Sequence, residues 1–209
     1  MKKSFVSIIV LSLFVMLFVS CGHTQSQVDG PDSVTSNFLQ ALQQQNYASA
    51  KTYYAENLDN MANFRNQIEE ISPSVANKLF SKMSDFSYTI NEVTIDPDDS
   101  TKASVTTTIT AYDLGKSFES AVLDYIKTDL EMTFDGATSD DVIEKTEEII
   151  VKEIESSEKT FVSDVTISLT KENDTWKIDK ISDNPTLLNA LSGNIINTID
   201  QLSASLESK

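Results

Sequence analysis

Apolar residues recur at helical spacing in the segment that begins at Pro31. The apolar positions of the first predicted helix share one face: Val34, Phe38, Leu39 and Leu42. A second helix is expected over residues 47–71, and Ser72-Pro73 ends it and begins a third helix that reaches Met83. The first fifty residues after Pro31 are therefore predicted to be helical.

The period of the pattern changes to two at Phe86. Phe86, Tyr88 and Ile90 alternate with polar residues, but Val93 and Ile95 fall on the opposite parity, which predicts a bulge near residues 91–92. Residues 96–100, DPDDS, are typical of a turn, and residues 102–112 alternate again. The two segments predict a β-hairpin.

Two amphipathic helices are expected between residues 114 and 159, the second capped by Ser139. Residues 161–178 then predict a second hairpin with a turn at KEND, and a helix follows Gly193-Asn194 at the C-terminal end. The pattern predicts one α+β domain. It has an antiparallel sheet of about four strands packed against the N-terminal helices, a helical insertion between the hairpins and a C-terminal helix.

The N-terminal segment has the pattern of an export signal. Lys2 and Lys3 precede an apolar run over residues 5–19, too short to span a bilayer, and the run stops at Cys21, the only cysteine. The sequence LFVSC at residues 17–21 resembles the lipobox of bacterial lipoproteins. That resemblance implies cleavage before Cys21, which becomes the mature N-terminus, and a diacylglyceryl group on its sulfur. Two or more acyl chains give stable anchoring. The alternative is an uncleaved signal anchor in which Cys21 is an incidental thiol.

These segments predict three parts: a signal peptide at residues 1–20, the lipidated cysteine and a tether at 21–31, and one domain at 32–209. Without the signal, the chain has 14 basic and 32 acidic side chains, a net charge of −18. Phosphate backbones and anionic headgroups repel such a surface, so we expect no nucleic-acid partner and a domain held off the membrane by its lipid. Solubility explains the charge most simply, and attraction of cationic peptides or metal ions is the alternative.

Two segments resemble the NTF2-like superfamily. VTSNFLQALQQQNYASAKTYYAE at residues 34–56 resembles its opening helix pair, and VTISLTKENDTWKIDKI at 165–181 resembles the final hairpin of its bacterial lipoprotein branches. The resemblance implies a curved sheet wrapped by N-terminal helices into a cone with an apolar hollow. The chain departs from the family in having fewer strands, and its added helices cover or fill the hollow. Some relatives are isomerases or dehydratases with a pocket histidine, but His23, the only histidine, lies in the tether.

The residue inventory argues against catalysis and against zinc. No histidine lies inside the domain and the one cysteine is the predicted lipid site, so neither a Cys-His pair nor a His/Cys zinc site can form. Two groups of carboxylates remain as candidates for a metal ion or for turn and cap chemistry, and we favour the second: Asp96, Asp98 and Asp99; Asp140, Asp141 and Glu144. A carboxylate-pair hydrolase would need two acids that converge on a cleft. We therefore expect no catalytic residue, no metal and no cofactor.

Aromatic side chains are the remaining candidates for a binding site. The six that could line an apolar pocket are Tyr53, Tyr54, Tyr88, Tyr112, Phe118 and Trp176. The alternative, which we favour, is that they belong to the core. The outer face of the sheet is rich in threonine and serine, which favours a solvated face and a monomer.

The sequence thus predicts an extracytoplasmic lipoprotein anchored to a bacterial cell membrane through Cys21. We expect a non-enzymatic binding or protein-interaction module whose partner is an envelope protein, peptide or glycan. The alternative is a carrier of a small apolar ligand in the pocket between sheet and helices. An enzyme is the least favoured reading.

Overall fold

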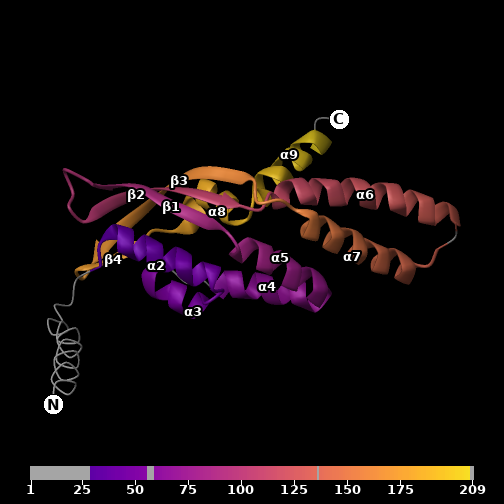
Figure 1. The fold of residues 1–209 in the computed structure, drawn as a ribbon, viewed down its shortest axis with the longest axis horizontal. Coiled ribbons are helices and arrows are strands. Elements are labelled where there is room, and N and C mark those ends of the chain that lie inside the picture. Colours follow the sequence, from indigo (N-terminus) through magenta and orange to yellow (C-terminus); the bar gives the residue numbers. More distant parts are fainter. Residues whose placement is uncertain (1–28, 56–58, 136, 208–209) are drawn as a thin grey trace, which may run out of the picture.

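The computed structural model describes residues 29–55, 59–135 and 137–207. Figure 1 shows their helices and strands in sequence colours. The elements are α2 (Pro31–Gln43), α3 (Tyr47–Ala50), the 3-10 helix η1 (Lys51–Tyr53), α4 (Asp59–Ile71), α5 (Pro73–Ser84), β1 (Ser87–Ile95), β2 (Lys102–Ala111), α6 (Leu114–Asp135), α7 (Ser139–Ser156), β3 (Phe161–Glu172), β4 (Thr175–Ile178), the 3-10 helix η2 (Ile181–Asp183), α8 (Pro185–Leu191) and α9 (Ile195–Glu207).

The strands form one antiparallel sheet in the order β1-β2-β3-β4, which confirms the predicted α+β class and both hairpins. One face of β2 is buried, and α2 and α8 pack against this inner face. The opposite face of β2 and β3, with its threonines and serines, is exposed or partly exposed. The polar alternation thus marks the solvated face, as predicted.

The space between α2 and the sheet is filled by side chains. Phe38 and Leu39 of α2 meet Ile109, Ile167 and Leu169 of the sheet, and each is at most 1% exposed. All residues of this core cluster lie between positions 34 and 191. Among the described residues, the core thus extends from α2 to α8.

The predicted bulge in β1 is present. The pairing of β1 with β2 shifts register between Ile90 and Glu92, and Val93 then pairs with Val105. The extra residue returns Val93 to the inner face, because side chains alternate along a strand and one inserted residue reverses their parity.

The predicted second helix over residues 47–71 is not continuous: α3 and α4 are helical as predicted, but residues 51–55 between them are not α-helical. A 3-10 turn follows α3, and Tyr54 is extended, at φ −112° and ψ 141°. Tyr54 forms a parallel bridge with Ile178 of β4, and its hydroxyl accepts a hydrogen bond from the backbone N–H of Ile181 at 2.8 Å. These contacts with the far end of the chain override the local helical preference.

Two local details complete the comparison. The cap of α7 is Thr138 and not the predicted Ser139, because Thr138 and Asp141 satisfy each other's backbone N–H groups in a capping box. The predicted KEND turn is present, with Asn173 and Asp174 at φ 47° and 64°. Asparagine and aspartate tolerate this left-handed conformation, which suits a two-residue hairpin turn.

Helices α4, α5, α6, α7 and α9 extend beyond one end of the sheet (Figure 1). The start of α2 lies near β4 at the other end, and the α6–α7 hairpin projects away from the body. The molecule therefore has a sheet end, where the described chain begins, and a helical end.

Candidate functional site

An apolar pocket of about 760 Å³ lies at the helical end. Its lining comes from α4, α5, α6, α7, η2, α8 and α9 and contains no strand residue and no charged side chain. The lining residues are Phe64, Ile68, Val75, Leu79, Phe80, Met83, Leu114, Ser117, Phe118, Ala121, Val122, Tyr125, Thr146, Ile150, Ile154, Ile181, Leu188, Leu191, Ser192, Ile195, Ile196 and Ile199.

A helix start signal positions one wall of the pocket. Ser72 accepts a hydrogen bond from the N–H of Val75, and Pro73 begins α5, so Val75 and Leu79 project one turn apart into the pocket. An ion pair between Lys78 and Glu155 joins α5 to α7 on the outside. The apolar stripe of α5 therefore faces the pocket while its charged side holds the neighbouring helix.

A close approach of α6 and α9 builds the opposite wall. Gly115 donates its backbone N–H to Gly193 at 2.8 Å, and an added Cβ on Gly115 would lie 2.6 Å from the backbone oxygen of Asn194. Only glycine fits there, because a side chain would push α9 away. The contact sets α9 beside α6, so that Ile195 and Ile199 reach the pocket.

The pocket has a closed floor and a side open to solvent. Phe80, Leu114 and Ala121 are buried, whereas the lining residues Phe64 and Phe118 are exposed. An open hollow with such a lining leaves apolar surface in contact with water, which is unfavourable and favours occupation by an apolar molecule.

Three of the four hydroxyl groups in the lining donate to nearby backbone oxygens, and the fourth is the phenol of Tyr125. Ser117 donates to the backbone oxygen of Asp113 at 3.5 Å, Thr146 to that of Val142 at 2.7 Å, and Ser192 to that of Asn189 at 3.1 Å. A donor already engaged in this way does not orient a polar ligand strongly. The arrangement suits a hydrocarbon.

The six aromatic residues predicted as pocket candidates do not come together. Phe118 alone among them lines the large pocket. Tyr54 is part of the core, and Tyr88 packs against its edge with its hydroxyl 2.8 Å from that of Ser36. Tyr53 and Trp176 meet at a second hollow of about 280 Å³, which also includes Asp29 and Asp174. That these aromatics bind a ligand remains a prediction.

Tyr112 belongs to a charged cluster outside the pocket. Lys82 Nζ lies 3.9 Å from the centre of the Tyr112 ring, a cation–π contact. The Tyr112 hydroxyl donates to Asp85 at 3.1 Å. Lys159 donates to the same carboxylate at 2.9 Å, and this bond holds the pKa of Asp85 below its usual value. The hydrogen bond to Asp85 raises the pKa of Tyr112. The cluster ties α5 to the ends of β2 and α7.

Three of the predicted carboxylates accept hydrogen bonds from backbone N–H groups of their own turns. Asp96 accepts from the N–H groups of Asp98 and Asp99, Asp99 accepts from Thr101, and Asp141 caps α7. Within the described residues, no group of three or more histidine, cysteine or acidic side chains is placed to hold a metal ion. Cys21 and His23 lie outside the described residues.

The sequence predicts the helices that line the pocket, but it does not predict the pocket itself. The pattern of residues 114–154 indicates amphipathic helices, and the resemblance places the hollow under the sheet. The lining residues come from six separate helices and a 3-10 turn, so no single segment carries a binding signal.

Comparisons with known proteins give one structural likeness. YcdA of Bacillus subtilis, described with its crystal structure as a candidate lipoprotein, is similar at a TM-score of 0.46 and 12% identity. The similarity covers 78% of this chain and 57% of that one. No family model matches the chain, and neither does any curated protein. A likeness at this level carries no argument about function.

Within the described residues, no helix combines the length and the apolar character that crossing a bilayer requires.

Proposed function

We propose that this protein is an extracytoplasmic lipoprotein, anchored through acylated Cys21, that binds an apolar ligand in the pocket at its helical end. One observation carries the binding part of the proposal: the pocket of about 760 Å³ has no charged residue in its lining. Pockets of about 300–1,000 Å³ are the usual size of small-molecule sites. Burial of hydrocarbon supplies the affinity, at about 0.8 kcal/mol per CH2 group.

The proposal moves the ligand from the predicted cone to the helical end. Phe38, Ile109 and Leu169 fill the space under the sheet, so a carrier function needs another hollow. The helices between and after the two hairpins line such a hollow. We keep the NTF2-like relation as part of the proposal; its support is the helix α2 on the inner face and the terminal hairpin with Trp176 buried.

The anchor is supported by the sequence and by the shape of the body. The apolar run that ends at Cys21 motivates it, and α2 begins at the sheet end, away from the α6–α7 hairpin (Figure 1). A tether of about ten residues would hold the sheet end near the bilayer. The pocket would then face the aqueous side, where a ligand can enter.

We propose no enzymatic activity. The pocket hydroxyls of Ser117, Thr146 and Ser192 are engaged by their own helices, and the titratable cluster at Asp85 lies outside the pocket. The function is binding, without a group placed to act as acid, base or nucleophile.

Binding of a solvatochromic dye tests this function. Nile red added to residues 29–209, which contain the core cluster of the described residues, should show blue-shifted emission, and decanol should displace it. Ala121→Trp fills the pocket and should reduce dye binding at least tenfold. Ala48→Trp places the same side chain on exposed α3 and is the matched control. Equal dye binding by both variants and the parent would contradict the proposal.

A further inference from the structure

Helix α6 exposes a row of large apolar side chains on the projecting hairpin. Leu123, Ile126, Leu130 and Phe134 are 62%, 50%, 56% and 86% exposed. Their spacing of three, four and four residues places them on one face of a helix. We refer to these four residues as the α6 stripe.

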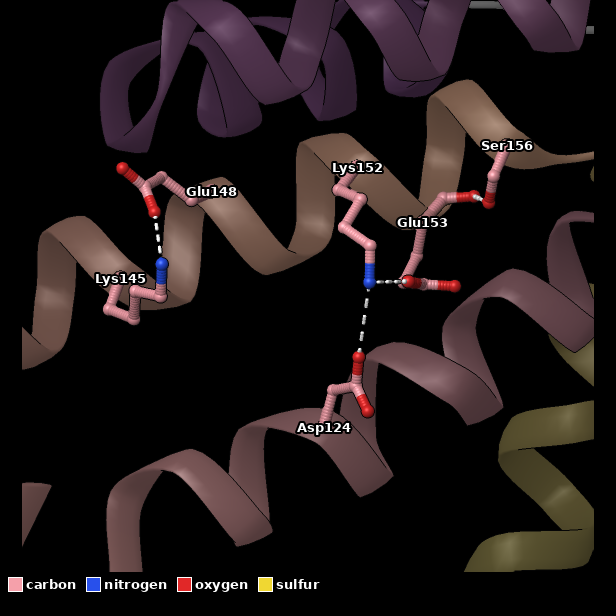
Figure 2. A network of polar contacts seen from close by, with 6 residues as sticks. All are labelled: Asp124, Lys145, Glu148, Lys152, Glu153 and Ser156. Atoms are coloured by element: carbon pink, nitrogen blue, oxygen red, sulfur yellow. Dashed lines mark hydrogen bonds and ion pairs between the residues drawn. The ribbon is translucent and has the colours of Figure 1, made fainter. Parts of the chain in front are cut away.

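The α6 stripe faces away from the pocket and from α7, and α9 packs at the start of α6 near Gly115. Ala121 and Tyr125 line the pocket, and on a helical wheel they lie on the side opposite to the stripe, whereas Val122 lies at the border, one turn before Ile126. Figure 2 shows Lys152 of α7 reaching Asp124 of α6 at 3.4 Å and Glu153 at 2.9 Å. Asp124 lies about a quarter turn from the stripe, so α7 packs elsewhere on α6.

Two interactions support the hairpin that carries the stripe. The capping box of Thr138 and Asp141 begins α7, and the Lys152–Asp124 pair braces the two helices (Figure 2). An exposed apolar row on such a braced projection is available for docking without rearrangement. Leu123, Ile126 and Leu130 have the three-four spacing of a coiled-coil seam, and Phe134 extends it by a further four residues.

Charge determines which occupant fits. The segment of residues 114–156 carries twelve acidic and four basic side chains, a net charge of −8. Two copies of this hairpin would place like charges together, and anionic headgroups would be repelled in the same way. A helix with an apolar seam and basic flanks complements both the stripe and its surroundings.

We propose that the α6 stripe docks an amphipathic helix of a partner protein whose apolar seam is flanked by lysine or arginine side chains. Leucine or isoleucine of the partner packs between Leu123, Ile126 and Leu130, and its cations face the carboxylates around the stripe. This interaction surface goes beyond the pocket and does not depend on the pocket being filled.

Two synthetic peptides provide the test. Both carry leucine at heptad positions a and d, one with lysine and one with glutamate at e and g. Residues 29–209 should bind the lysine peptide and not the glutamate peptide, and added salt should weaken the binding. Leu130→Asp and Phe134→Asp should each weaken it at least tenfold. Ile71→Asp, at a position 82% exposed on α4, should bind as the parent does.

Each alternative occupant has its own outcome. Equal affinity of the lysine peptide for the parent and both stripe variants would show attraction by charge alone and overturn the proposal. Sedimentation that shows a dimer abolished by Leu130→Asp would assign the stripe to a second copy. Binding to phosphatidylglycerol vesicles that Leu130→Asp abolishes would assign it to lipid. Nile red binding should be unchanged in the stripe variants, which separates this result from the pocket.

Discussion

The hydroxyl of Tyr54 accepts a buried hydrogen bond from the backbone N–H of Ile181 at 2.8 Å. The two residues are 127 positions apart, and the bond joins the N-terminal helices to the segment that leads into α8. It also fixes the extended conformation that interrupts the helical run at Tyr54. One contact therefore holds the end of the N-terminal helices against the segment that precedes α8.

Removal of that hydroxyl should destabilise the protein. Tyr54→Phe leaves the N–H of Ile181 buried without a partner, which costs about 1–3 kcal/mol of unfolding free energy. Urea unfolding followed by circular dichroism measures the change. Tyr53→Phe, at a partly exposed position, should change stability by less than about 0.5 kcal/mol. Equal effects of the two substitutions would contradict this role of Tyr54.

At Thr107, in contrast, we expect a substitution to raise the unfolding free energy. Its Oγ1 is fully buried on the inner face of β2 and has no hydrogen-bond partner within the described part of the chain. Thr107→Val keeps the shape and removes the unpaired hydroxyl, so the unfolding free energy should rise by about 1 kcal/mol.

The control for Thr107 is its neighbour on the outer face. Thr108 donates to Asp164 at 2.5 Å and accepts from Asn91 at 2.8 Å. Thr108→Val should therefore leave stability unchanged or lower it slightly. Thermal unfolding of the two variants separates them, and a stabilised Thr108→Val with a destabilised Thr107→Val would refute the assignment of faces.

The Asp85 cluster predicts a pH-dependent contribution to stability. The hydrogen bond from Lys159 lowers the folded-state pKa of Asp85 below its unfolded value of about 3.9. The charged carboxylate therefore stabilises the fold above that pH, and the contribution is lost as the pH falls through the folded-state pKa. Because the pair is on the surface, Asp85→Asn should cost only about 0.2–1 kcal/mol at pH 7.

Unfolding curves of the parent and Asp85→Asn should converge as the pH falls below about 4. Lys159→Gln should have a similar effect at pH 7, and the double variant should lose little more than either single variant. A difference between parent and Asp85→Asn that persists unchanged at low pH would show that charge is not its cause.

Gly115 should resist a substitution that normally stabilises helices. Glycine-to-alanine in a helix usually gains about 0.5–1 kcal/mol, but a Cβ here would press on Asn194 and on the hydroxyl of Thr198. Gly115→Ala should instead lose about 1–3 kcal/mol and widen the gap between α6 and α9. Ser120→Ala, also on α6, is the control and should be neutral or slightly stabilising. A stabilised Gly115→Ala would show that the two helices are not in close contact.

Periodicity predicted most of the fold because most elements obey local rules. The bulge after Ile90 follows from a change of parity, and the turn at Asn173-Asp174 follows from residues that tolerate positive φ. The split at Tyr54 could not be predicted, because its cause is a contact with Ile181 on the other side of the core. The cap of α7 was displaced by one residue, since Thr138 and Ser139 are both good cap residues and only geometry selects one.

The candidate site was less accessible to sequence reasoning. Two of the predicted aromatics, Tyr54 and Trp176, are core residues, because large side chains bury much surface wherever they lie. The pocket is made of ordinary leucine, isoleucine and valine positions on helices whose packing partners the sequence does not specify. An apolar lining has the same pattern as a core, and only the arrangement of helices shows that it is open.

The dependence of affinity on chain length tests the central claim, an apolar pocket that binds hydrocarbon, most directly. Primary alcohols from hexanol to dodecanol would be titrated against Nile red bound to residues 29–209. Each added CH2 group should tighten binding about fourfold, which corresponds to about 0.8 kcal/mol, until the pocket is filled. The Ala121→Trp variant should show a much weaker dependence. Affinity that does not change with chain length in the parent protein would contradict the account.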